Sequence, residues 1–172
     1  MNSHELESVM RHDPHTDSLF HGVYACDTLP RALFQLSALF IVNTDPASKP
    51  GTHWQAIFVD KDRRGEFFDS YGLPPFVPQH VQFLNKMCKS YKYNHVDLQA
   101  LDSSVCGQYC VMYLLFKAHG FSMTHFVKHN FTADCKKNDK AVQKMFQNYS
   151  KNVKLCDNFL SKNQSCCKRK RK

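Results

Sequence analysis

Cys106 is the residue whose surroundings best suit nucleophilic chemistry. It is one of eight cysteines in a chain of 172 residues. It follows the loop segment Leu101-Asp102-Ser103-Ser104 and opens an apolar stretch that runs to His119. This pattern predicts the N-terminus of a buried helix, where free N–H groups lower a thiol pKa. Gly107 would let a carbonyl group approach the backbone closely. The alternative is that Cys106 and Cys110 are both small core residues, as free cysteines commonly are.

Two further residues could activate and orient such a thiol. His53 opens an aromatic and β-branched segment, residues 53–59, directly before Trp54, the only tryptophan. A neutral imidazole there could accept a thiol proton, shielded from water by the indole. Asp69 lies in a second apolar segment, residues 66–71, where a buried carboxylate needs a partner. If the two segments form a hairpin, the Asp69 carboxylate can reach the His53 imidazole. The alternatives are that His53 is an ordinary surface histidine and that Asp69 forms an ion pair with a nearby Lys or Arg.

Gln99 is a candidate oxyanion donor. It precedes Cys106 by seven positions, and its side-chain amide could donate to a developing oxyanion beside the backbone N–H of Cys106. A single glutamine carries no weight, so its value comes from its position relative to the other three residues. Thiol, imidazole, carboxylate and amide are together the groups that thiol-dependent acyl transfer requires.

The elements that would position these residues indicate an α+β domain with a small central mixed or antiparallel sheet flanked by helices. Helices are expected at residues 3–12, 78–91 and 104–119 and, in two or three pieces, over 121–160; strands are expected at 38–44, 53–59, 66–71 and 95–99. Residues 1–160 are expected to form one domain, and residues 161–172 a basic C-terminal tail.

The cysteine pattern and the chain's opening residues limit its cofactors and compartment. The close pairs Cys106/Cys110 and Cys166/Cys167 have no matching C-x2-C partner, which disfavours a structural zinc site. The first residues are polar and no run of 18 apolar residues occurs, so a membrane span and a secreted location are not expected. We expect reduced thiols and no cofactor required for the chemistry.

Charge is concentrated at the C-terminal end. The chain has 23 Lys+Arg against 15 Asp+Glu, a formal net charge of +8, and its last five residues are all basic: Lys168, Arg169, Lys170, Arg171 and Lys172. Such a run is typical of a nuclear-localisation or nucleic-acid-binding patch. A solvated terminus is the alternative, and the two are compatible.

The order His53-Trp54, Asp69, Gln99, Cys106-Gly107 resembles that of the adenovirus-type cysteine proteases (adenain), a group related to the SUMO-specific proteases. The likeness covers residues 3 to about 115 and includes Ile41-Val42-Asn43-Thr44 and Phe67-Phe68-Asp69-Ser70-Tyr71-Gly72. The second of these segments looks like that of the compact enzymes of Polinton (Maverick) elements and adintoviruses. The adenovirus enzymes usually have Glu where this chain has Asp69, whereas SUMO-type relatives use Asp.

The resemblance implies the adenain/SUMO-protease-like fold and a role for each motif residue. Cys106 would be the nucleophile and His53 the base. Asp69 would be the third member and Gln99 the oxyanion-hole amide, with Trp54 packed beside the catalytic histidine.

The resemblance also implies a maturation protease that cuts capsid precursor proteins after a small-residue motif such as Gly-Gly or Gly-Ala, in the host nucleus and the virion. The adenovirus enzymes are stimulated by DNA and by a short basic peptide joined through a disulfide, so both are implied partners. Cys88 lies roughly where the peptide-linking cysteine would fall; a packed Cys88 is the alternative. Two other functions remain open: a SUMO- or ubiquitin-like-protein protease with the same four residues, and an inactive basic nucleic-acid-binding module on a protease fold.

Overall fold

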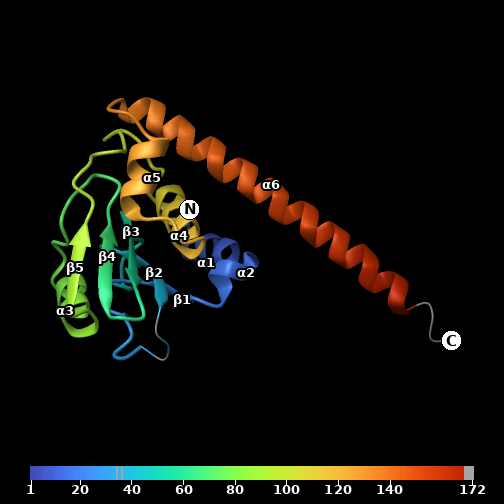
Figure 1. Ribbon diagram of the computed structural model, residues 1–172, viewed down its shortest axis with the longest axis horizontal. Coiled ribbons are helices and arrows are strands. Elements are labelled where there is room, and N and C mark those ends of the chain that lie inside the picture. Colours follow the sequence, from blue (N-terminus) through green and yellow to red (C-terminus); the bar gives the residue numbers. More distant parts are fainter. Residues whose placement is uncertain (34, 36, 169–172) are drawn as a thin grey trace.

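The computed structural model describes residues 1–33, 35 and 37–168. A five-stranded mixed sheet lies at its centre, in the order β1-β2-β3-β4-β5, with helices around it (Figure 1). In chain order the elements are α1 (Ser3–His12), α2 (Pro14–Asp17), β1 (Phe20–Tyr24), β2 (Ala38–Asn43), β3 (Trp54–Val59), β4 (Arg64–Phe68), α3 (Pro78–Met87), β5 (Ser90–Tyr93), α4 (Cys106–Ala118), α5 (Met123–Asn130) and α6 (Cys135–Lys168). The α+β class predicted from the sequence is confirmed.

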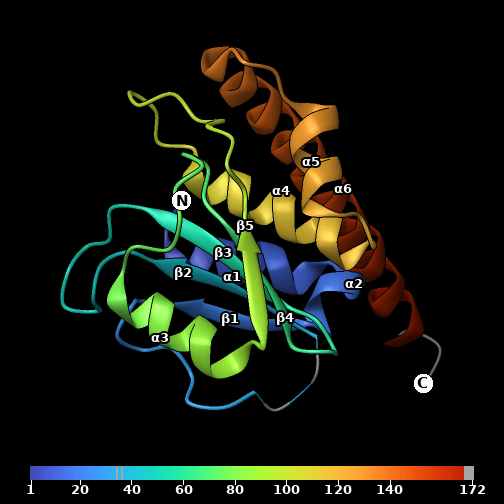
Figure 2. The same cartoon turned by 60° about the vertical axis from the view of Figure 1, so that its left-hand side comes forward.

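Helices cover both faces of the sheet (Figures 1 and 2). Alternate residues of β2 supply the two cores: Leu39 and Ile41 pack with α1, α4 and α5 on one face, and Phe40 and Val42 pack with α3 on the other. Every residue of β2 is therefore buried, which explains why its sequence is continuously apolar rather than alternating.

The central strands carry the predicted hairpin. β3 and β4 pair antiparallel from Ala56 opposite Phe68 to Val59 opposite Gly65. Asp60 closes the turn, because its carboxylate accepts the backbone N–H groups of Asp62 and Arg64. This register brings the beginning of β3 and the end of β4 to the same edge of the sheet.

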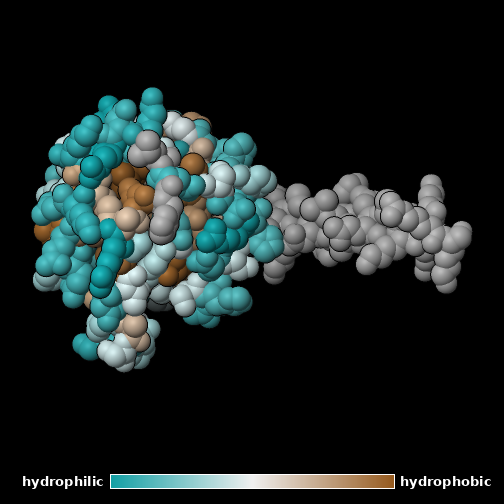
Figure 3. All heavy atoms as spheres, turned by 90° about the horizontal axis from the view of Figure 1, so that it is seen from below, coloured by the Kyte–Doolittle hydropathy of each residue, from teal (hydrophilic) through white to brown (hydrophobic). Residues whose placement is uncertain are grey.

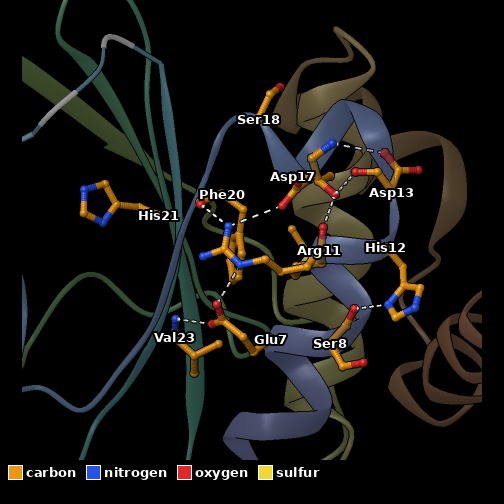
Figure 4. Close-up of polar contacts among 12 residues, drawn as sticks. Glu7, Ser8, Arg11, His12, Asp13, Asp17, Ser18, Phe20, His21 and Val23 are labelled. Atoms are coloured by element: carbon orange, nitrogen blue, oxygen red, sulfur yellow. Dashed lines mark hydrogen bonds and ion pairs between the residues drawn. The ribbon is translucent and has the colours of Figure 1, made fainter.

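Helix α1 is fastened to β1 by side-chain contacts (Figure 4). Glu7 accepts the backbone N–H of Val23 at 3.2 Å. Arg11 donates to Glu7 at 2.9 Å, to the backbone oxygen of Phe20 at 3.1 Å and to Asp17 at 3.4 Å. These contacts hold the N-terminal segment across the sheet, where it also covers part of α4.

Helix α4 is the central helix of the larger core. Nine of its residues are buried, among them Cys106, Tyr109 and Tyr113. The Tyr113 ring stacks on Phe68 with centroids 4.6 Å apart. The hydroxyl of Tyr109 lies 3.0 Å from the backbone oxygen of Leu98. The start of α4 is thus held rigidly between the sheet and the segment that leads into it.

Two sequence-based assignments are wrong in position. The helix expected at residues 78–91 ends at Met87, and Ser90–Tyr93 form strand β5, which pairs in parallel with β4. Residues 95–99, expected as a strand, are instead irregular, and the backbone N–H groups of Leu98 and Gln99 both donate to the oxygen of Ser70. The short strand β1 was not foreseen either, because residues 19–36 contain only brief apolar pieces.

The face of the molecule shown in Figure 3 is mainly hydrophilic, with apolar residues gathered near its middle. Helix α6 passes over the body and projects beyond it (Figure 1). Lys168 ends this helix, whereas the basic residues 169–172 lie outside the described residues, so the proposed tail remains a prediction. Within the described part of the chain, no helix is both long and apolar enough to cross a membrane.

Candidate active site

Three element ends meet at the edge of the sheet and bring the predicted residues together. His53 directly precedes β3, Asp69 directly follows β4, and Cys106 is the first residue of α4. His53 Nε2 lies 3.2 Å from Asp69 Oδ2. The His53 side chain also hydrogen-bonds Cys106, and since Nε2 faces the carboxylate, Nδ1 is the nitrogen left for the thiol.

The thiol and the imidazole shift each other's acidity in opposite directions. Burial alone would raise the pKa of Cys106, but hydrogen bonds from His53 and from the backbone N–H groups of Trp54 and Gly107 outweigh it, so the thiol pKa is lowered. Burial alone would lower the pKa of His53, but its bonds to Asp69 and Cys106 raise it to about 9. Both shifts favour a thiolate–imidazolium pair near neutral pH.

Asp69 is fully buried and its carboxylate is well supplied with donors. Oδ1 accepts the backbone N–H of Tyr71 at 2.7 Å, and Oδ2 accepts from Gln55 as well as lying beside His53. The Asn94 side chain hydrogen-bonds both backbone groups of Asp69: its Oδ1 accepts the N–H, and its Nδ2 donates to the carbonyl oxygen. Among the described residues no Lys or Arg pairs with Asp69, so its charged partner is the imidazole, as the hairpin argument required.

Gln99 lies on the segment that leads into α4 and is 1% exposed. Its Oε1 accepts the hydroxyl of Ser70 at 2.7 Å, and its Nε2 donates to the backbone oxygen of Ser103 at 3.1 Å. These bonds fix the direction of the amide and leave a second N–H on Nε2. The role of Gln99 as an oxyanion donor stays a prediction.

The first turn of α4 has no side-chain cap. Its N-cap is Val105, which makes no capping hydrogen bond, so no side chain there takes up the N–H groups of this turn. The N–H of Gly107 is among the groups that lower the pKa of the Cys106 thiol. Gly107 packs against Met1, because a Cβ at this position would lie 3.2 Å from Met1 Cβ. Trp54 Nε1 donates to the backbone oxygen of Met1 at 3.0 Å. A cavity of about 590 Å³ opens beside the indole, lined in part by Tyr24.

Three residues of this region were missed by the sequence argument. The ring of Tyr71 lies 4.9 Å, centroid to centroid, from that of His53. Gln55 binds Asp69, and His80 of α3 binds Gln55. The spacing of two between His53 and Gln55 could have placed both on one strand face, but nothing in the sequence connects His80 with the site.

The other described cysteines are unsuited to be nucleophiles. Cys88 is buried at the end of α3, and burial raises its thiol pKa to about 11. Its position favours the packed alternative, while the peptide disulfide stays a prediction. Burial also raises the pKa of Cys110, well above the ordinary value, and those of Cys26 and Cys135. Within the described residues no group of three or more His, Cys, Asp or Glu side chains is arranged to hold a metal ion.

Comparisons with known proteins find similarity to a cysteine protease. No family model matches the chain. It is 29% identical over 106 residues to "Cysteine protease S273R" of African swine fever virus, a match that covers 54% of this chain and 38% of that protein. The chain thus spans well under half the length of the curated relative it matches. The crystal structure of that protease, pS273R, aligns with 26% identity over 59% of this chain and 41% of the other, at a TM-score of 0.42.

The fold is shared with ChlaDub1 of Chlamydia trachomatis, at a TM-score of 0.51 and 16% identity, over 69% of this chain and 62% of that chain. The SUMO protease Ulp1 aligns over 87% of this chain and 78% of the other, at 13% identity and a TM-score of 0.43. The chain therefore has an α+β fold shared with ChlaDub1, in agreement with the predicted fold class, and the viral protein that it resembles in sequence is the African swine fever virus protease rather than an adenovirus enzyme.

Proposed function

We propose that this protein is a cysteine endopeptidase with Cys106 as nucleophile, His53 as base and Asp69 as the orienting acid. The observation that carries the proposal is the meeting of three side chains: His53 lies 3.2 Å from Asp69, and His53 and Cys106 are close enough to shift each other's pKa, that of the thiol downward and that of the imidazole to about 9. Structural thiols in the same chain show the opposite shift. Perturbed acidity of this kind is typical of a catalytic pair.

The chemistry follows from the positions of the groups. The Cys106 thiolate attacks the substrate carbonyl, and the oxyanion accepts the backbone N–H of Cys106 and the spare N–H of Gln99. The His53 imidazolium then donates its proton to the leaving amine, which departs. Water, deprotonated by His53, hydrolyses the resulting thioester and restores the pair. Asp69 holds the imidazole in one tautomer throughout.

The substrate we propose is a capsid precursor of a virus or virus-like element, cut after a small-residue motif such as Gly-Gly or Gly-Ala, in the host nucleus and the virion. Similarity to a viral cysteine protease supports a viral setting. Two partners belong to the same proposal: DNA, bound through the basic tail by its phosphates, and a short basic activating peptide. The proposal includes that the chain is related to adenain, within the group that contains the Polinton and adintovirus enzymes.

The test offers two substrate types to the purified full chain and to its Cys106→Ala variant. One is a panel of short peptides with Gly-Gly or Gly-Ala sites, and the other is a folded ubiquitin-like protein with a Gly-Gly-linked extension. Cleavage of the peptides by the parent and not by the variant supports the proposal. Cleavage of only the folded fusion would favour the ubiquitin-like-protein protease, and no turnover of either would favour the inactive nucleic-acid-binding module.

A further inference from the structure

A line of buried polar side chains leads from the active site to His80 of α3, by way of Gln55 on the sheet face that α3 covers. Gln55 Nε2 donates to Asp69, and Gln55 Oε1 lies 3.0 Å from Nδ1 of His80. His80 Nε2 lies 3.1 Å from the backbone oxygen of Asn43. Asp69, Gln55 and His80 have no exposed surface. Because water does not reach these groups, each contact has to be satisfied within the line itself.

Counting the hydrogens assigns a charge to His80. The backbone oxygen of Asn43 can only accept, so Nε2 of His80 must carry a proton. Gln55 directs its NH2 group at Asp69, which leaves its oxygen facing Nδ1 of His80, so Nδ1 must carry a proton as well. With both ring nitrogens protonated, His80 is a cation, and the Gln55 amide lies between it and the Asp69 carboxylate.

A neutral His80 would leave its contact with Gln55 without a hydrogen bond. If Nδ1 were bare, its lone pair would face Gln55 Oε1. Turning the amide over would repair that contact but would place Oε1 against the ionised carboxylate of Asp69. Burial opposes the cation and outweighs the hydrogen bond to the backbone oxygen of Asn43, so the pKa of His80 is lowered to about 4. At neutral pH the second proton therefore has to be held by Oε1 of Gln55 and by the charge of Asp69.

We propose that His80 is a positioning residue of the active site and that it holds two protons while Asp69 is ionised. The protonated ring fixes the direction of the Gln55 amide, and the amide fixes the Asp69 oxygen that orients His53. The consequence for catalysis rests on the proposed protease function, whereas the proton count rests on the four buried groups alone.

Few groups that could titrate surround the ring. His80 meets Gln55 on β3 and Asn43 on β2, and the ring of Phe67 on β4 lies 6.4 Å away, centroid to centroid. Among the described residues no charged side chain contacts His80. Asp69, reached through one amide, is the titratable group that faces it, so the protonation of His80 and the ionisation of Asp69 are linked.

The first experiment is nitrogen-15 NMR of the histidine rings in the intact chain at neutral pH. Buried N–H groups exchange slowly, so a doubly protonated His80 gives two one-bond N–H correlations. The proposal expects both. A single correlation from His80, with the other nitrogen bare, would overturn it. This readout needs no substrate and no variant, so it decides the proton count even if the proposed peptidase activity is absent.

The second experiment measures the pH dependence of Cys106 alkylation in three variants. His80→Met removes both donors, and we expect the midpoint of the alkylation profile to move to higher pH by about one unit, a tenfold change in the ionisation constant of the thiol. In His80→Lys the ammonium can donate to both acceptors, so alkylation should stay near that of the parent. His95→Met, at an exposed histidine, is the control and should change nothing.

An unchanged alkylation profile in a folded His80→Met variant would overturn the positioning role. Where peptide cleavage is measurable, the variant should lower kcat and leave KM unchanged, because His80 is remote from bound substrate. The expected shift in His80→Met, without any cleavage of peptide by the parent, would instead count against the proposed function, so the two failures are distinguishable.

Discussion

Cys106 and Cys110 lie one turn apart on α4, and the pKa values of their thiols are shifted in opposite directions. Cys106 receives hydrogen bonds from His53 and from backbone N–H groups, which lower its pKa. Cys110 is fully buried, and desolvation, reinforced by the nearby Cys106 and Asp69, raises its pKa well above the ordinary value. One turn of helix therefore separates a candidate nucleophile from a core residue.

This difference predicts which thiol reacts first. Iodoacetamide at limiting dose should label Cys106 ahead of every other cysteine, because the thiolate is the reacting form. Mass spectrometry of the digested protein checks this. Cys110→Ala should keep its activity and lose about 1 kcal/mol of folding free energy through a small cavity. Loss of activity in Cys110→Ala but not in Cys106→Ala would show that the nucleophile is misassigned.

The raised pKa of His53 sets the alkaline limit of activity. The imidazolium is the acid that protonates the leaving amine, so kcat/KM should fall as the pH rises through about 9, where His53 loses its proton. On the acid side, kcat/KM should fall as the pH drops below the lowered pKa of Cys106. A pH–rate profile measured on a peptide substrate checks both limbs.

Replacing Asp69 should move that alkaline limb. An Asn at this position keeps the size of the side chain but removes the charge that stabilises the imidazolium, so the His53 pKa should fall and the limb should shift to lower pH. The rate should drop less than in His53→Ala, which removes the proton acceptor itself. An alkaline limb in the same place as that of the parent would mean that Asp69 does not interact with the catalytic imidazole.

Gln99→Ala should reduce kcat by roughly 10²–10³, the usual effect of removing one oxyanion donor. KM should change little, because the bond forms mainly in the transition state. Ser70→Ala is the matched comparison: it removes the hydroxyl that holds the Gln99 amide but leaves the donor in place. It should therefore cost less than Gln99→Ala, and the reverse order would contradict the role given to Gln99.

Gly72 fixes the distance between Asp69 and the segment that carries Gln99. Its φ is +68°, and an added Cβ would lie 2.7 Å from the backbone carbon of Val96. Gly72→Ala should lower the free energy of unfolding by about 3 kcal/mol, from backbone strain and a clash that no side chain can relieve. Gly120→Ala is the control, since its φ is +84° but nothing lies within 4 Å. Gly120→Ala should lower the free energy of unfolding by only about 1–2 kcal/mol. A denaturant titration of both variants measures the difference.

The basic tail predicts salt-dependent DNA binding. Deleting residues 168–172 removes five positive charges, so DNA affinity should fall and the slope of log K against log salt should become shallower. Fluorescence anisotropy with a short duplex over a salt series measures both. Identical affinity and slope with and without the tail would exclude this segment as the phosphate-binding site.

The sequence was most informative where one local pattern determines the structure. The continuous apolar run of β2, the β3–β4 hairpin and the apolar helix after Cys106 were all recoverable, and with them the meeting of His53, Asp69 and Cys106. It was least informative where tertiary pairing decides. Ser90–Tyr93 could end a helix or form a strand, and pairing with β4 selects the strand.

The same limit applies inside the site. Tyr71 and Gln55 lie two residues from Asp69 and His53, so a strand-face argument could have found them. His80 comes from α3, which packs on the face of the sheet away from α4, and its contact with Gln55 depends on how α3 packs. No local pattern records that contact, which is why it emerged only from the coordinates.

The aromatic ring of Tyr71 limits how the catalytic imidazole can move. Its centroid lies 4.9 Å from that of His53, while the Asp69 carboxylate holds the ring edge at Nε2. Held on one face and at one edge, the imidazole has little freedom to flip about its Cβ–Cγ bond. A hydrolase built in this way uses a single nitrogen as proton shuttle in both half-reactions, so acylation and deacylation proceed without a ring rotation between them.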